Sequence, residues 1–105
     1  MTKWLTVMAA VFGLSVSSGI DGVKVDKVLR KDGGAMALLI RNETEDRIRV
    51  FEAKACAPDD CQTVYITGDF RTHAASWSDD FTPKGEPDSI VLTRVQSVEE
   101  AGDVQ

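Results

Sequence analysis

Residues suited to metal binding and catalysis are scarce in this chain of 105 residues, which has one His and two Cys. These three side chains cannot complete a four-ligand zinc site without carboxylates, so we expect no metal and no cofactor. Basic residues are also few, with 12 Lys and Arg against 17 Asp and Glu and a formal net charge of -5. Because nucleic-acid binding needs a positive surplus, we expect no nucleic-acid partner. The length allows one small domain.

Charged residues are absent from positions 4–20, which follow Lys3. Residues 5–16 form an apolar run of the length found in signal peptides. Small residues then offer two cleavage positions, after Ser18 or after Gly19, of which we favour the second. A membrane-spanning helix needs about 20 apolar residues, more than this run provides. We therefore expect a signal peptide over residues 1–19, and an uncleaved membrane anchor is the alternative.

The predicted signal peptide determines the expected location of the protein. A cleaved chain would be periplasmic or extracellular, whereas an uncleaved chain would be membrane-anchored with its folded domain exposed. The membrane is a partner only if residues 4–20 are retained. The mature chain would consist of a β domain over residues 20–97 and an acidic flexible tail over residues 98–105.

Hydrophobic patterning predicts β-strands in the rest of the chain. Apolar and charged residues alternate over residues 22–30, which indicates an amphipathic strand. The sequence Lys31-Asp32-Gly33-Gly34 follows and is typical of a tight turn, since glycine tolerates positive φ. Residues 35–41 are apolar on both faces and predict a central strand. A last strand is expected over residues 89–95.

Residues 47–56 and 61–70 flank a turn-forming stretch at residues 57–60, which together predict a β-hairpin. If Cys56 lies opposite Cys61, one face of the hairpin is apolar apart from Gln62. That face carries Phe51, Ala53, Ala55, Val64 and Ile66. The two Cys then lie on the other, solvent-facing side. Apolar Ile48 and Val50 break the alternation, so we expect a β-bulge near Val50.

Five predicted strands separated by turns indicate an all-β fold. We expect a small antiparallel β-sandwich of about five to seven strands, either immunoglobulin-like or a partly open barrel, preceded by an N-terminal hydrophobic signal or anchor helix. Residues 38–50 consist of an apolar strand, an Asn-Glu-Thr turn and the start of the next strand. This stretch resembles the second and third strands of immunoglobulin-like periplasmic domains.

Cys56 and Cys61 are the residues with the best-defined predicted role. Directly opposed positions of a hairpin lie within disulfide distance, and export would place them in an oxidising compartment. A redox-active pair is the alternative, but catalytic dithiols usually have two residues between the cysteines, and here there are four. We therefore predict a structural disulfide.

No arrangement of residues in the sequence predicts an enzyme. His73 precedes Ser76 and Ser78, but neither Ser lies in a nucleophile signature. The adjacent acids Asp59-Asp60 and Asp79-Asp80 lack the spaced pattern of a calcium loop and are expected in surface turns. The tripeptide Asn42-Glu43-Thr44 matches a glycosylation acceptor.

Residues 71–88 form a long predicted connection, and such connections in small domains are either functional or disordered. Trp77 and Phe81 lie four residues apart in it and are candidate anchors for a partner, with the two acids between them as steering charges. The alternative is that both aromatics cap the core beneath their own loop. The predicted partner-binding residues are Trp77, Phe81, Asp79, Asp80 and His73.

The sequence leaves two hypotheses of function in different classes. The first is a small exported, non-enzymatic binding module, such as an inhibitor or immunity-type protein that occludes a cationic protein partner. The second is a membrane-anchored structural subunit of an envelope or virion assembly. A cell-wall glycan that stacks on Trp77 is a further candidate partner.

Overall fold

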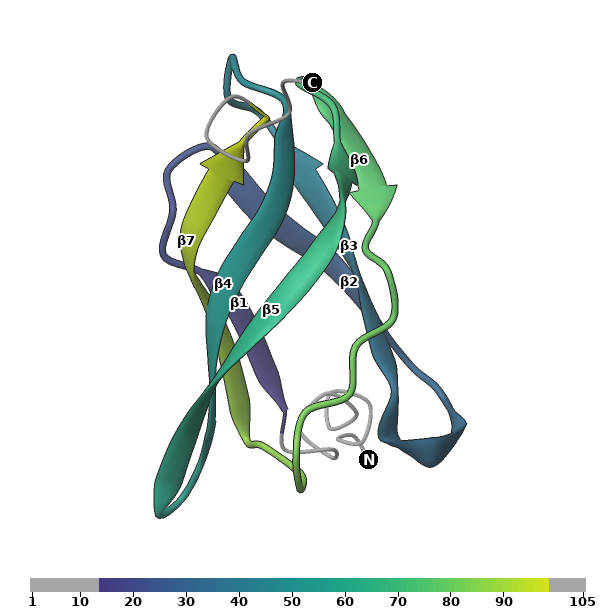
Figure 1. Cartoon of the computed structure of the whole chain (residues 1–105), viewed down its shortest axis with the longest axis vertical. Helices are drawn as coiled ribbons and strands as arrows, with labels where there is room; N and C mark the ends of the chain where they lie inside the picture. Colours follow the sequence, from purple (N-terminus) through teal and green to yellow (C-terminus); the bar gives the residue numbers. More distant parts are fainter. Residues whose placement is uncertain (1–13, 99–105) are drawn as a thin grey trace, which may run out of the picture.

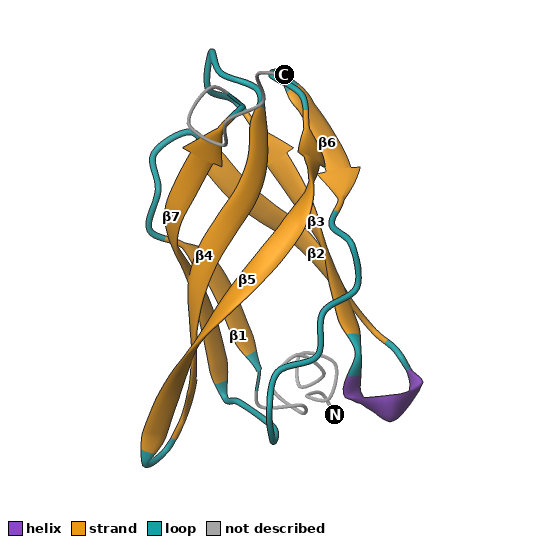
Figure 2. Cartoon of the chain, viewed as in Figure 1, coloured by secondary structure: helices purple, strands orange, loops and turns teal. Residues whose placement is uncertain are grey.

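The computed structural model describes residues 14–98, which form seven strands in two sheets and one short 3-10 helix, Asp32–Gly34 (Figures 1 and 2). The strands are β1 (Ser15–Ser18), β2 (Val23–Arg30), β3 (Met36–Asn42), β4 (Ile48–Ala57), β5 (Asp60–Phe70), β6 (Ala74–Trp77) and β7 (Ser89–Ser97). One sheet has the order β1-β7-β4-β5 and the other β2-β3-β6. The predicted all-β fold is confirmed. Most of the predicted signal or anchor and almost all of the acidic tail lie outside the described residues.

The two sheets share one hydrophobic core. The inward-facing side chains alternate along the strands, and the largest of them are fully buried. These are Phe51, Phe70, Leu38, Ile40, Ile48, Ile66, Ile90 and Leu92. Phe51 and Phe70 meet edge to face, with ring centroids 5.0 Å apart. β3 is almost continuously buried, which confirms the prediction of a central strand.

The predicted register of the β4–β5 hairpin is confirmed. Cys56 pairs with Cys61, and Phe51 pairs with Ile66 on the buried face. The register shifts between Ile48 and Val50, which is the expected bulge. The turn is shorter than the four residues predicted, because Ala57 and Asp60 are themselves paired.

Two short strands were not expected from the sequence. β6 lies within the predicted connection over residues 71–88 and pairs with the end of β3, where Trp77 is opposite Leu39. β1 lies in the segment expected to contain the cleavage site, and the described β structure therefore begins at Ser15, before the predicted start of the domain. β1 pairs with β7 in parallel, so the predicted antiparallel arrangement is wrong at this pair, whereas the other strand pairs in the described residues are antiparallel.

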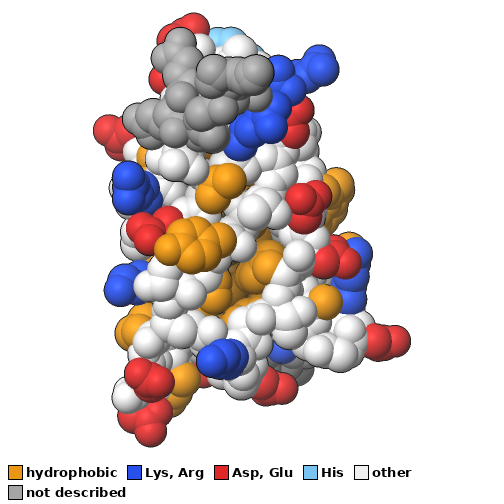
Figure 3. Space-filling view, in the orientation of Figure 1, with side chains coloured by type: hydrophobic (Ala, Val, Ile, Leu, Met, Phe, Trp, Pro, Cys, Tyr) orange, Lys and Arg blue, Asp and Glu red, His pale blue; other side chains and the backbone are white. Residues whose placement is uncertain are grey.

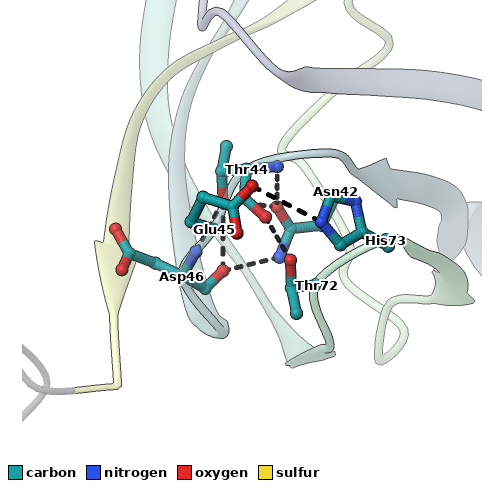
Figure 4. A network of polar contacts seen from close by, with 6 residues as sticks. All are labelled: Asn42, Thr44, Glu45, Asp46, Thr72 and His73. Atoms are coloured by element: carbon teal, nitrogen blue, oxygen red, sulfur yellow. Dashed lines mark hydrogen bonds and ion pairs between the residues drawn. The ribbon is translucent and has the colours of Figure 1, made fainter.

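A buried amide ties three segments together where β3 ends (Figure 4). Asn42 is fully buried, and its Nδ2 donates to the carbonyl oxygens of Asp46, at 2.8 Å, and Phe70, at 2.9 Å. Its Oδ1 accepts from the backbone nitrogen and the hydroxyl of Thr44. Every hydrogen of the amide is therefore used, and the folded chain leaves no room for a glycan at the predicted acceptor Asn42.

Removal of this amide should destabilise the whole domain. We expect Asn42→Ala to lower the free energy of unfolding by about 3 kcal/mol, because the buried carbonyl group of Phe70 and the partly buried carbonyl group of Asp46 lose their donor. Glu45→Gln serves as the control, since Glu45 belongs to the same loop but is exposed. Urea unfolding of both variants measures the difference. Equal stability of the two variants would show that the amide network is not structural.

Candidate contact surfaces

The β4–β5 hairpin forms one end of the molecule (Figure 1). Ala57 and Asp60 are its last paired residues, so only Pro58 and Asp59 form the turn. The side chains from Pro58 to Asp60 are exposed, whereas Ala53 and Ala55 further up β4 are buried in the core. The hairpin is therefore anchored at one end and free at the other.

A disulfide joins the two strands one residue pair away from this turn. Cys56 and Cys61 are bonded, with their Cα atoms 4.0 Å apart, which agrees with the predicted disulfide. Cys61 is exposed on the side of the hairpin that faces away from the core. The bond fits an oxidising compartment. Because it closes the hairpin directly behind the turn, it restricts the conformations that the turn can adopt.

Acidic side chains gather at this end of the molecule (Figure 3). Asp59 and Asp60 come from the turn, and Asp88 joins them because its backbone nitrogen donates to the carbonyl oxygen of Cys56 at 2.7 Å. Within residues 14–98 these three exposed carboxylates form no ion pair and no side-chain hydrogen bond. We call Asp59, Asp60 and Asp88 the acidic tip.

Gln62 holds the chain before β7 against the hairpin. Its amide donates to the carbonyl oxygen of Lys84 at 2.9 Å and accepts from the nitrogen of Lys84 at 3.0 Å. This pair of bonds explains why one polar residue lies on the apolar face of the hairpin. It also fixes the segment that carries Asp88, so the acidic tip is built from two segments far apart in sequence.

Trp77 lies on a different surface, the outer face of the three-stranded sheet. Its side chain is 47% exposed, and the register places it in one row with Leu39 and Lys27. Leu29, which is 45% exposed, lies opposite Ala37 in the neighbouring row. We call Trp77, Leu39, Leu29 and Lys27 the Trp77 face.

Phe81 does not join Trp77 on this face. Its backbone forms two hydrogen bonds with Met36, of 2.8 and 2.9 Å, and its ring packs against the core. Between the two aromatics, Ser78 is buried and its hydroxyl accepts from the nitrogen of Leu38. Phe81 therefore covers the core, as the alternative prediction had it, whereas Trp77 is exposed and available for contact.

The other predicted contact residues have partners within the chain. Asp80 forms an ion pair of 2.8 Å with Lys31, and the carboxylate of Asp79 accepts from the hydroxyl of Thr67 at 3.0 Å. His73 has a positive φ of 59° and lies beside Glu45, with 3.5 Å between Nε2 and Oε2. His73 lies next to the Asn42 network (Figure 4). It precedes β6, whereas Trp77 is the last residue of that strand.

Among residues 14–98, the carboxyl group of Asp69 has a clearly shifted pKa. The hydrogen bond from Arg47 lowers the pKa of Asp69, and the charges of Arg47, Arg49 and Arg71 act in the same direction. Both carboxylate oxygens of Asp69 accept from the guanidinium group of Arg47, at 2.8 and 2.6 Å. This pair is exposed and links the residue before β4 to β5, so we assign it a structural role.

Neither a metal site nor a membrane span is found in residues 14–98. No group of three His, Cys, Asp or Glu side chains there lies close enough to hold a metal ion. The same part of the chain has no helix that is long and apolar enough to cross a membrane. No protein-family model, no curated protein and no solved structure matches the chain.

Sequence reasoning identified the acids of the turn but not the acidic tip. Asp59 and Asp60 were expected only as turn-forming surface residues. Asp88 carries no sequence signal at all, since its position depends on Gln62 and on the pairing of β4 with β7. The sequence signal that could have indicated the acidic tip is the pair Asp59-Asp60 between Cys56 and Cys61.

Loss of the disulfide should lower stability without abolishing the fold. We expect Cys56→Ala/Cys61→Ala to lower the free energy of unfolding by about 2 kcal/mol, because a chain without the disulfide has more entropy in the unfolded state. For a domain of this size the melting temperature should fall by about 10 °C. Thermal melts of the variant and of the reduced parent protein measure this effect. An unchanged melting temperature in both would contradict it.

The two aromatic residues should differ in their effect on stability. We expect Phe81→Ala to lower the free energy of unfolding by about 2 kcal/mol, since its ring packs against the core. Trp77→Ala should change it by less than about 1 kcal/mol, because the side chain is half exposed. Urea titrations of both variants provide the comparison. A larger loss for Trp77→Ala would mean that Trp77 is structural and not a contact residue.

Proposed function

We propose that this protein is a small exported, non-enzymatic binding module with an immunoglobulin-like β-sandwich fold. It acts in the periplasm or outside the cell, where its acidic tip enters and occludes a cleft on a cationic protein. The observation that carries this proposal is the hairpin that ends in a two-residue turn, with a disulfide directly behind the turn and unpaired carboxylates in front of it.

The rigidity of the hairpin supports an inhibitory role. A loop that is already held in one conformation loses little entropy on binding, so more of its contact energy appears as affinity. The disulfide limits the turn on one side, and the Gln62–Lys84 hydrogen bonds fix the neighbouring segment on the other. A projecting loop of this kind fits a concave site better than a flat surface.

Charge supports a basic partner. The protein has a formal net charge of -5, which accelerates association with a cationic surface. The contact charges now proposed differ from Asp79 and Asp80, because those two carboxylates already have partners in the fold. The three carboxylates of the acidic tip have none in the described part of the chain, so a partner's Lys or Arg would not have to displace an existing contact.

A membrane-anchored structural subunit is the second candidate, and one observation favours it. Ser15–Ser18 form β1 of the four-stranded sheet, so a chain that keeps this segment also keeps a complete sheet. Retention of residues 1–19 would then serve both the anchor and the fold. The N-terminal residue of the protein from its native source distinguishes the two candidates.

Charge reversal at the acidic tip tests the proposed function. We expect Asp59→Lys/Asp60→Lys to weaken binding to a cationic cell-wall hydrolase by at least about tenfold, because attraction becomes repulsion. The control Asp21→Lys/Asp32→Lys changes the net charge equally at two exposed acids outside the tip. Biolayer interferometry against a panel of purified cationic hydrolases, at low and high salt, measures both variants.

The control separates steering by total charge from contact at the tip. If both double variants lose affinity equally, only the net charge matters and the acidic tip is not the contact site. If the parent protein binds none of the cationic proteins in the panel, the proposed inhibitory function is wrong.

A further inference from the structure

We propose that the outer edge of β7 is an acceptor site for an extended segment of another protein, which replaces β1 there. We call residues 89–96 of β7 the acceptor edge. The inference does not depend on the acidic tip, which lies on the β4–β5 hairpin. It concerns the one strand pair in the described structure that runs in parallel.

β1 shows how a strand is held at this edge. Four residue pairs join it to β7, from Ser15 with Ser89 to Ser18 with Leu92. Backbone bonds flank them, from the nitrogen of Ser15 to the carbonyl oxygen of Asp88 and from the nitrogen of Gly19 to that of Leu92. The edge of β7 therefore presents backbone groups that can hydrogen-bond to another strand. Such backbone pairing is the basis of β-strand addition.

The side chains of β1 define what the acceptor edge takes. Val16 of β1 and the flanking Leu14 and Ile20 pack against the core. The inward position between Val16 and Ile20 is Ser18, and Ser15 and Ser17 are exposed. An occupant thus needs apolar residues at the inward positions held by Leu14, Val16 and Ile20, and the outward positions tolerate small polar residues. The structure assigns the edge to an extended segment with this alternation, aligned parallel to β7.

β1 fills only part of the edge. Its pairing ends at Leu92, because after Ser18 the chain turns towards β2, whereas β7 continues to Ser97. No described strand pairs with residues 93–96 on this side. A segment longer than β1 would gain backbone bonds along residues 93–96 that β1 cannot make.

The predicted cleavage positions give the edge a role. Cleavage after Ser18 or after Gly19 removes every residue of β1. The mature domain would then expose the hydrogen-bonding edge of β7, together with the core surface that Leu14 and Val16 cover in the full chain. Open edges of this kind bind other strands readily, so removal of the leader would couple export to capture of a partner.

A displaced β1 tests the proposal in the full chain. Val16→Asp places a charge where an apolar side chain packs on the core and should release β1, whereas Ser17→Asp, the control, lies on the exposed side. The probe is a fluorescein-labelled peptide with the sequence of residues 14–20. Fluorescence anisotropy measures its binding, and hydrogen exchange of β7 locates it.

We expect the Val16→Asp chain to bind the peptide at least about tenfold more tightly than the parent and Ser17→Asp chains. In those two the tethered β1 competes at an effective concentration in the millimolar range. The bound peptide should slow hydrogen exchange in residues 89–92, and a peptide with Asp in place of its Val should not bind.

The remaining outcomes also decide the question. If Val16→Asp unfolds the chain, recovery of a cooperative melt on addition of the peptide supports the acceptor edge, and failure to recover overturns it. Equal peptide binding by all three chains overturns it as well. A Val16→Asp chain that dimerises and excludes the peptide would assign the edge to a second copy of this chain, which contradicts a site for another protein.

Discussion

The register of β4 against its two neighbours decides which side chains enter the core. β4 lies between β5 and β7, and its residues Phe51, Ala53 and Ala55 are buried. A slip by one residue would expose them and turn Glu52 and Lys54 inward. Ile48 is also buried, at an odd distance of three residues from Phe51, which strict alternation forbids. The bulge between Ile48 and Val50 resolves this conflict, and the disulfide fixes the register at the other end of the strand.

Sequence patterns predicted the parts of the fold that carry their own signal. The hairpin register followed from the alternation of β4 and β5 and from two Cys that had to meet. β1 and β6 carry no such signal, because each has four residues and consists mostly of Ser and Ala. Their conformation is determined by the free edges of β7 and β3, which belong to the tertiary structure.

The candidate contact residues were only partly predictable for a related reason. A spacing of four suggested that Trp77 and Phe81 act together, but β6 ends at Trp77 and the chain then turns inward through the buried Ser78. Which acidic side chains are available for contact depends on whether each one has a partner within the fold. Asp79 and Asp80 are bound to Thr67 and Lys31, and sequence alone cannot tell such tied carboxylates from the unpaired ones of the acidic tip.

The segment that follows β6 also protects the edge strand β5 from pairing with other copies of the chain. β5 is an edge strand of 11 residues, and an uncovered strand of this length is a template for aggregation. The nitrogen of Asp79 donates to the carbonyl oxygen of Thr67, and further along Gln62 joins its amide to the backbone of Lys84. An irregular segment that cannot extend a sheet is thereby held along the edge. Sheet growth at β5 would begin only after this cover had detached, so the resistance of this edge to aggregation depends on a few hydrogen bonds outside any strand.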